Sequence, residues 1–255
     1  MSVLLSQREG KVEILTLNRP EQRNALNSEL MEALSAALKS AELCAEVRVV
    51  VLTGAGDKAF CAGMDLKDFA AGPGDRVPRS TQYFEALIEG RFSKPVIAAA
   101  QGTAVAGGFE LMLSCDLAVV SRTARFGIPE VRHGLFPGGG GVLLPARIPL
   151  AVALELGLTG ETIDAQRIEQ LGLANRVVAP EAVLATALEL AHKVAANAPL
   201  GVAATKRLMW ACVQDGVAST RPEVQKTISQ VFNSTDAQEG ARAFAEKRPP
   251  RWRGV

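Results

Sequence analysis

The stretch KPVIAAAQGTAVAGGFELMLSCDLAVVS, residues 94–121, carries the clearest fold signal in the chain. Its first part, KPVIAAAQG, is a continuous apolar run that is typical of a buried strand. FELMLSC indicates a short helix, and DLAVVS is again typical of a strand. A strand, a helix and a strand in immediate succession predict an α/β domain built from repeated strand–helix units.

The same alternation extends toward the N-terminus. KVEILTLN, residues 11–18, alternates as a strand does. SELMEALSAALKSAEL, residues 28–43, has apolar residues at helical spacing after a Ser/Asn start. VRVVVLTGAG, residues 47–56, is a β-branched run ending in glycines, and it predicts another buried strand.

The C-terminal part of the chain has a different character. From about Pro180 onward strand patterns stop, and helices are predicted for residues 180–198, 199–214 and 221–234. No low-complexity linker or internal repeat separates this part from the rest. We therefore expect an α/β core over residues 1–195 and a helical module over residues 196–255.

Composition excludes several classes of function. The 255 residues carry 28 basic and 27 acidic side chains, a net charge of +1, so no overall field favours nucleic acid or an anionic membrane. No apolar run approaches the roughly 20 residues that span a bilayer, and no secretory leader pattern opens the chain. Four scattered cysteines and two histidines argue against a zinc site, so we expect free thiols in a cytoplasmic protein without a metal.

Glu110 is a lone carboxylate in the apolar sequence AVAGGFELMLSCD, residues 104–116. Burying an unpaired carboxylate costs several kcal/mol. Such a residue therefore faces water, finds a partner or is kept for chemistry. Glu130, directly after Pro129, is by contrast an ordinary acidic residue in the first turn of a predicted helix, and a structural role is expected for His133.

Two backbone segments raise the possibility of an oxyanion site. Gly107 stands at the expected start of a helix, where amide groups have no intrahelical partner. Met64 lies between Gly63 and Asp65, after a glycine-punctuated strand end. Two such amides can hold one carbonyl oxygen, although the spacing alone fits two unrelated turns equally well.

Three kinds of nucleotide or nucleophile motif are missing. TGAGDKAFCAG lacks the third glycine of a dinucleotide fingerprint, and PGGGG, residues 137–141, lacks the Lys-Ser/Thr of a phosphate loop. No Gly-x-Ser-x-Gly elbow occurs. On this basis the glycine clusters are expected to form tight turns.

Five segments resemble, in order and in register, the enoyl-CoA hydratase/isomerase (crotonase) superfamily over essentially the whole chain. The resemblance implies a spiral of ββα units followed by a helical trimerisation region, and hence a homotrimer or a dimer of trimers. The five segments are NRPEQRNALN, AFCAGMDL, KPVIAAAQGTAVAGGFELMLSCDLAVVS, ARFGIPEVRHGLFPGGGG and EGARAFAEKRPPRW.

The family's functional residues transfer position by position. The two oxyanion amides fall on Met64 and Gly107, and the two hydratase glutamates fall on Glu110 and Glu130. The resemblance also places Phe244 and Lys247 near the CoA nucleotide, often that of a neighbouring subunit. The CoA-binding segments fall on Arg23, Ala25, Leu26, Ala62, Asp65, Leu66 and Lys67.

The implied function is that of an enoyl-CoA hydratase, a hydro-lyase for which CoA enters as part of the acyl-CoA thioester substrate and no separate cofactor is needed. GGVLLPARIP, residues 140–149, departs from common hydratases and is similar to carnitinyl-CoA dehydratase-type members. A Δ3,Δ2-enoyl-CoA isomerase, an RNA-binding crotonase-fold protein and an inactive scaffold stay open as alternatives. Residues 68–92 correspond to the family's variable acyl-pocket wall and identify no substrate.

Overall fold

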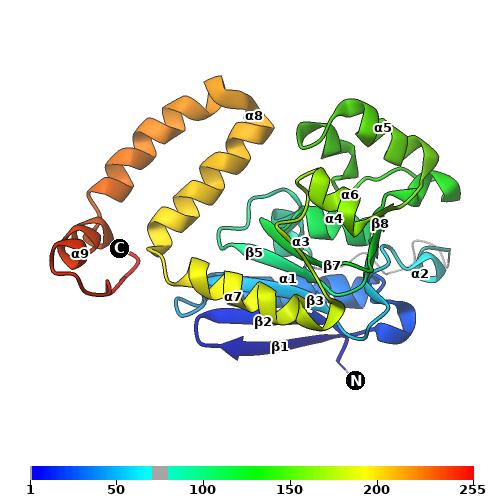
Figure 1. Ribbon diagram of the computed structural model, residues 1–255, viewed down its shortest axis with the longest axis horizontal. Helices are drawn as coiled ribbons and strands as arrows, with labels where there is room; N and C mark the ends of the chain where they lie inside the picture. The colour runs from blue at the N-terminus through cyan, green and yellow to red at the C-terminus, as the bar shows by residue number, and fades with distance from the viewer. Residues whose placement is uncertain (1, 71–79) are drawn as a thin grey trace.

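The computed structural model, which describes residues 2–70 and 80–255, arranges the strands in two sheets (Figure 1). The larger sheet has six strands in the order β1-β2-β3-β5-β7-β10, all parallel except for the antiparallel β1–β2 hairpin. Its strands are Leu4–Glu9, Val12–Leu17, Val49–Gly54, Val96–Ala100, Leu117–Ser121 and Arg176–Val178.

The smaller sheet has four short strands in the order β4-β6-β8-β9: Ala59–Cys61, Thr103–Val105, Arg125–Gly127 and Ile163–Asp164. Each of β3, β5 and β7 in the large sheet is followed in the chain by a strand of the small sheet and then by a helix or 3-10 turn. This repeat confirms the predicted spiral of ββα units. The stretch at residues 94–121 supplies one unit and the next strand: β5, β6, α4 (Gly107–Leu113) and β7.

The core forms on both faces of the large sheet because alternate strand residues point to opposite sides. Along β5, Val96, Ala98 and Ala100 face the cluster shared with α1 (Ser28–Leu43) and the small sheet, whereas Ile97 and Ala99 face α7 (Val183–Ala195). On α1, Leu30, Leu34, Leu38 and Ala41 are buried at helical spacing, and the Asn27 side chain caps the first turn by accepting from Leu30 N.

The other helices lie around these layers. They are α2 (Leu66–Ala70), α3 (Gln82–Ile88), α5 (Leu150–Thr159) and α6 (Ala165–Gln170), with 3-10 turns at Pro20–Gln22, Pro129–His133, Gly141–Ala146 and Pro180–Ala182. None of the helices in the described part of the chain combines the length and apolar character needed to cross a bilayer.

The C-terminal region is helical, as predicted, and extends away from the sheets (Figure 1). α8 (Pro199–Phe232) breaks at Gly216, whose φ is +82°, so that two predicted helices form one bent element. Near its start α8 is fastened to the core by Asp116, which accepts from Lys206 Nζ at 2.8 Å and from Trp210 Nε1 at 2.7 Å. The role of this region in trimerisation and its division from the core at residue 195 stay predictions.

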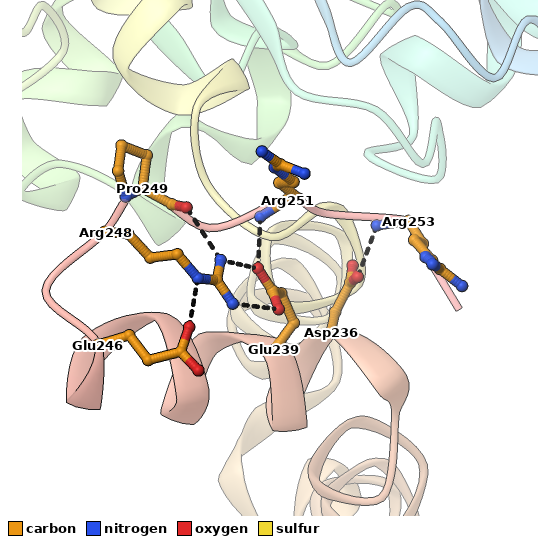
Figure 2. A network of polar contacts seen from close by, with 7 residues as sticks. All are labelled: Asp236, Glu239, Glu246, Arg248, Pro249, Arg251 and Arg253. Carbon is orange, nitrogen blue, oxygen red and sulfur yellow. Dashed lines mark hydrogen bonds and ion pairs between the residues drawn. The ribbon is translucent and has the colours of Figure 1, made fainter.

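Residues 248–254 fold back across α9 (Thr235–Ala245), as Figure 2 shows. Glu239 accepts two hydrogen bonds from the guanidinium of Arg248, at 2.6 and 3.0 Å, and one from the amide of Arg251. The hydrogen bond and charge of Arg248 lower the pKa of Glu239 to about 2. Asp236 accepts from the amides of Arg253 and Gly254, so these backbone donors hold the end of the tail against α9.

Candidate active site

The two predicted oxyanion amides lie against each other where β4 and β6 end. A Cβ at Gly63 would meet Gly107 N at 2.9 Å and Ala106 Cβ at 2.7 Å, so the chain can approach this closely only because residue 63 is glycine, with φ at +87°. Gly107 is the first residue of α4, and its N–H has no partner within the helix. Among the described residues, neither the Met64 nor the Gly107 N–H has an acceptor.

Ala106, directly before Gly107, adopts φ +50° and ψ −136°, a conformation that alanine rarely takes. Its backbone is held there by donation to Gly127 O at 2.9 Å and by acceptance from the amides of Phe109 and Glu110. Local strain of this kind persists where surrounding contacts over-determine the geometry, and it gathers at functional sites.

Glu110 lies in the first turn of α4, only 5% exposed. Its Oε1 accepts from the amides of Gly139 at 2.9 Å and Gly141 at 2.8 Å. Burial raises the pKa of the carboxyl, and the two amides act in the opposite direction. The PGGGG turn therefore serves Glu110, a link that sequence reasoning missed because the donors are backbone groups 29 and 31 positions away.

Glu130 follows Pro129 in a 3-10 turn and is 9% exposed. Neither carboxylate oxygen has a hydrogen-bond partner among the described residues. Burial raises the pKa of Glu130, and the charge of nearby Glu110 raises it further. Glu130 is in the first turn, as the local pattern predicts, but it is not an ordinary surface residue, because it is the one buried residue of a turn whose Val131, Arg132 and His133 are exposed.

Met64, Gly107 and Glu110 share one cavity of about 320 Å³. Its remaining walls are mostly apolar and come from α3 with the residue after it, from Leu26 and Met31 at the start of α1, and from the PGGGG turn. The lining residues are Leu26, Met31, Met64, Phe84, Glu85, Ile88, Glu89, Gly107, Glu110 and Gly139. The arrangement can hold a carbonyl oxygen at the two amides with a carboxylate beside the neighbouring carbons.

The two predicted CoA-binding segments are joined by backbone hydrogen bonds. Ala62 N donates to Arg23 O at 3.0 Å, Leu26 N to Gly63 O at 2.7 Å and Asp65 N to Leu26 O at 2.9 Å. Leu66 and Lys67, the other two residues of the second segment, begin α2 directly after Asp65. The Asp65 carboxylate itself forms an ion pair with Arg19 at 2.9 Å.

Comparison with known proteins agrees with this geometry. The family model described as enoyl-CoA hydratase/isomerase matches residues 7–255. The chain belongs to this family. Relatives include an enoyl-CoA hydratase of Mycobacterium tuberculosis (strain ATCC 25618 / H37Rv), 40% identical over 96% of this chain and 94% of the relative. A carnitinyl-CoA dehydratase of Proteus mirabilis (strain HI4320) is 39% identical over 99% of this chain and 98% of the relative.

Solved structures give the same picture. An enoyl-CoA hydratase from Mycobacterium marinum superposes with a TM-score of 0.91 at 44% identity, covering all of both chains. One from Bacillus anthracis gives 0.92 at 35% identity, covering 99% of this chain and all of the other. The predictions of the crotonase-type fold and of an enzyme of the hydro-lyase type are confirmed at the level of the family.

Phe244 and Lys247 lie apart from the other predicted site residues of this family member. They belong to α9 and the residues after it, at the opposite end of the molecule from α2 (Figure 1). Phe244 is 88% exposed. Within one chain the structure does not bring them to the cavity, so their role at a neighbouring subunit's CoA stays a prediction. Of the expected acyl-pocket wall, residues 71–79 lie outside the described part of the chain.

Sequence reasoning also missed two residues that build the site, Arg19 and Asn24. Asn24 is fully buried with φ at +54°, accepts from Arg19 N and donates to the carbonyls of Ala55 and Ala59. Both residues lie in the segment NRPEQRNALN, in which polar side chains are unusually frequent. This concentration of polar residues was the feature of the sequence that could have indicated them. Their partners are remote in sequence, so the segment alone could not identify them.

Proposed function

We propose that this protein is an enoyl-CoA hydratase, which reversibly adds water across the 2,3 double bond of an enoyl-CoA thioester. The single observation that carries the proposal is the buried carboxylate of Glu110, which shares one cavity with the amides of Met64 and Gly107, two donors without an acceptor among the described residues. Glu130 is a second buried carboxylate, and the charge of Glu110 acts on it although Glu130 itself does not line this cavity. Hydration needs one base and one acid together with stabilisation of an enolate, and these groups match that requirement.

The surroundings of the two glutamates suggest different protonation states. Glu110 has two amide donors on one oxygen, which stabilise its ionised form. No group of the described residues meets hydrogen-bond geometry with the Glu130 carboxylate, and burial together with the charge of Glu110 raises its pKa against the lowering effect of its own backbone amide, so its protonated form is favoured. Two carboxyl groups whose environments differ in this way commonly divide the roles of base and acid.

In the proposed reaction the thioester oxygen lies at the Met64 and Gly107 amides. Glu110 takes a proton from a water molecule while the oxygen of that water bonds to Cβ. The electron pair of the double bond moves into the thioester, which becomes an enolate. Glu130 then gives its proton to Cα, which restores the carbonyl. The two glutamates have exchanged protonation states, and a proton moving from Glu110 to Glu130 through water completes the cycle.

CoA arrives in this proposal as part of the substrate, and neither a metal nor a redox cofactor takes part. We further propose a cytoplasmic homotrimer or dimer of trimers. The four free cysteines, Cys44, Cys61, Cys115 and Cys212, fit a reducing compartment. Sedimentation at micromolar concentration tests the assembly, and a monomer would contradict it.

A carnitinyl-CoA dehydratase-type activity is the second candidate, and the 39% identical relative of Proteus mirabilis favours it. Such a substrate carries a trimethylammonium group, which proteins commonly bind with aromatic rings. Phe84 is the one aromatic side chain among the described residues that line the cavity. Glu85 in α3 accepts from Thr81, and Glu89, directly after α3, forms an exposed ion pair with Arg91. The other side chains of the lining are mostly apolar, which suits the uncharged acyl group of a simple enoyl-CoA.

The test incubates the enzyme with 2-enoyl, 3-enoyl and crotonobetainyl thioesters and identifies products by mass spectrometry. A 3-hydroxyacyl-CoA from the 2-enoyl thioester supports the proposal, whereas conversion of only the 3-enoyl thioester identifies an isomerase. Glu110→Gln should lower hydration by roughly 10²–10⁴ because it cannot accept a proton. It should still exchange the Cα hydrogen of a saturated acyl-CoA with D₂O, whereas Glu130→Gln should lose both reactions.

A further inference from the structure

Arg19 is a nearly buried arginine behind the oxyanion site. Its Nη2 donates to Asp65 Oδ2 at 2.9 Å, and its Nη1 donates to the carbonyl of Ala25. Both members of the ion pair are 14% exposed. Arg19 does not line the 320 Å³ cavity, so it is placed to act on the site only through other groups.

The Ala25 carbonyl and the Leu26 N–H belong to the same peptide unit. Leu26 N donates to Gly63 O at 2.7 Å, and the Gly63 carbonyl belongs in turn to the same unit as the Met64 N–H. A trans peptide unit is planar, with its C=O and N–H pointing in opposite directions. A hydrogen bond to each carbonyl therefore fixes the direction of the N–H on the other side.

The result is a continuous chain of donors that begins at a positive charge and ends at a free amide. The guanidinium of Arg19 binds the first peptide unit, that unit binds the second, and the Met64 N–H at the end has no acceptor among the described residues. Hydrogen bonds arranged in such a chain polarise one another. A cation at one end makes the terminal N–H a better donor to a developing negative charge.

Asp65 holds the arginine in this position. One of its oxygens accepts from Arg19, and the other accepts from Lys67 N at 3.2 Å and Asp68 N at 3.5 Å. Burial alone would raise the pKa of Asp65, but Arg19 and these amides lower it, so the ion pair persists in mild acid. Asp65 N also donates to Leu26 O at 2.9 Å, which ties the two peptide segments on the far side of Met64.

We propose that Arg19 is a positioning residue that orients and polarises the Met64 amide through the peptide units 25–26 and 63–64. This inference rests on the proposed oxyanion role of Met64. Gly107, the other amide, depends instead on the first turn of α4, since the Ala106 carbonyl of its peptide unit accepts from Phe109 N and Glu110 N. The two halves of the oxyanion site are therefore held by different means.

The test is isotope-edited infrared spectroscopy of a saturated acyl-CoA with a ¹³C-labelled thioester carbonyl, bound to the enzyme. Polarisation of the carbonyl lowers its stretching frequency, so the bound ligand should absorb at lower frequency than the free one. Arg19→Gln should lose a substantial part of this shift. Its kcat and kcat/KM should fall together by about 10-fold, less than the 10²–10³ expected for deletion of an oxyanion donor.

Arg125→Gln is the matched control, because Arg125 likewise donates to a backbone carbonyl, Thr162 O at 2.7 Å, from a position outside the cavity lining. It should leave both the shift and the rate unchanged. Should Arg19→Gln fail to fold, Arg19→Lys replaces it in the test. An ammonium group cannot donate to Asp65 and the Ala25 carbonyl with the geometry of a guanidinium, so the carbonyl frequency should lie between those of the wild-type complex and of the free ligand.

A full wild-type shift in a folded Arg19 variant overturns the inference, whatever happens to the rate. The measurement uses a ligand that cannot be hydrated, so it is independent of the proposed reaction. A protein that hydrates enoyl-CoA but whose carbonyl shift ignores Arg19 refutes only the inference. One that hydrates nothing but shows an Arg19-dependent shift refutes only the proposed function.

Discussion

Gly139→Ala should leave the fold intact and remove most of the activity. A Cβ at Gly139 would lie 2.7 Å from Glu110 Oε2 and 3.2 Å from its Cδ. Gly139 is not among the glycines with positive φ, so alanine can adopt its backbone conformation. The clash falls on the end of a side chain, which can move aside without a change of backbone but loses its hydrogen bonds from Gly139 N and Gly141 N. The carboxylate would then leave the position from which it acts on water.

The expected loss follows from the role of the base. A displaced general base costs about 10²–10⁴ in rate, which corresponds to roughly 3–5 kcal/mol of transition-state stabilisation. Gly138→Ala is the matched control, because the nearest atoms to its Cβ belong to the Phe136 side chain at 3.5 Å, an ordinary contact. It should keep nearly wild-type activity.

The assay follows the loss of ultraviolet absorbance as the conjugated double bond of a short 2-enoyl-CoA is hydrated. Thermal unfolding of both glycine variants checks that the fold is retained. If Gly139→Ala is stable and hydrates within about threefold of Gly138→Ala, the observed placement of Glu110 is not the one used in catalysis. The reasoning from the PGGGG turn to the base would then be wrong.

Three further predictions address other parts of the site and fold. Met64→Ala should be nearly silent in hydration assays, whereas Met64→Pro, which has no N–H, should abolish turnover; equal loss in both would make the side chain the functional group. Folded Glu130 keeps its proton at pH values where the unfolded chain has lost it, so its contribution to stability falls as pH rises through its raised pKa. Glu130→Gln should therefore be more stable than wild type toward urea at neutral pH but not in acid. Lys206→Ala should cost about 3–5 kcal/mol of unfolding free energy by leaving Asp116 without its buried cation, and unchanged urea unfolding would contradict this.

Local sequence patterns predicted the helices and strands whose burial leaves a regular spacing of apolar residues in the sequence. The helix at residues 28–43 has the predicted bounds because Asn27 caps it and its apolar residues recur every three to four positions. The strands at 49–54, 96–100 and 117–121 were visible because they are buried on both faces. Their continuous apolar runs record that burial directly.

Local sequence patterns did not reveal the strands of the small sheet, which only the family resemblance implied, and the reason is physical. Its strands have two or three residues each, too few to show a period of two. They exist because the large sheet places successive chain segments side by side, which lets β4 pair with β6 and β6 with β8. The donors to Glu110 were hidden in the same way, since only the folded chain brings Gly139 and Gly141 to α4.

Three carboxylates in the described part of the chain are buried. Their hydrogen-bond partners distinguish the one that stabilises the fold from the two that are candidates for catalysis. Both oxygens of Asp236 accept from backbone amides of the tail, so this group is satisfied as an ion and serves the fold. Glu110 has one oxygen held by two amides, while its other oxygen adjoins the cavity wall at Gly139. Glu130 has no partner for either oxygen. A chain that needed these groups only for stability would gain from apolar replacements, because burying an unsatisfied carboxylate is unfavourable. Glu110 shares its cavity with two amides that lack acceptors among the described residues, so a carboxylate and two free donors face the same space.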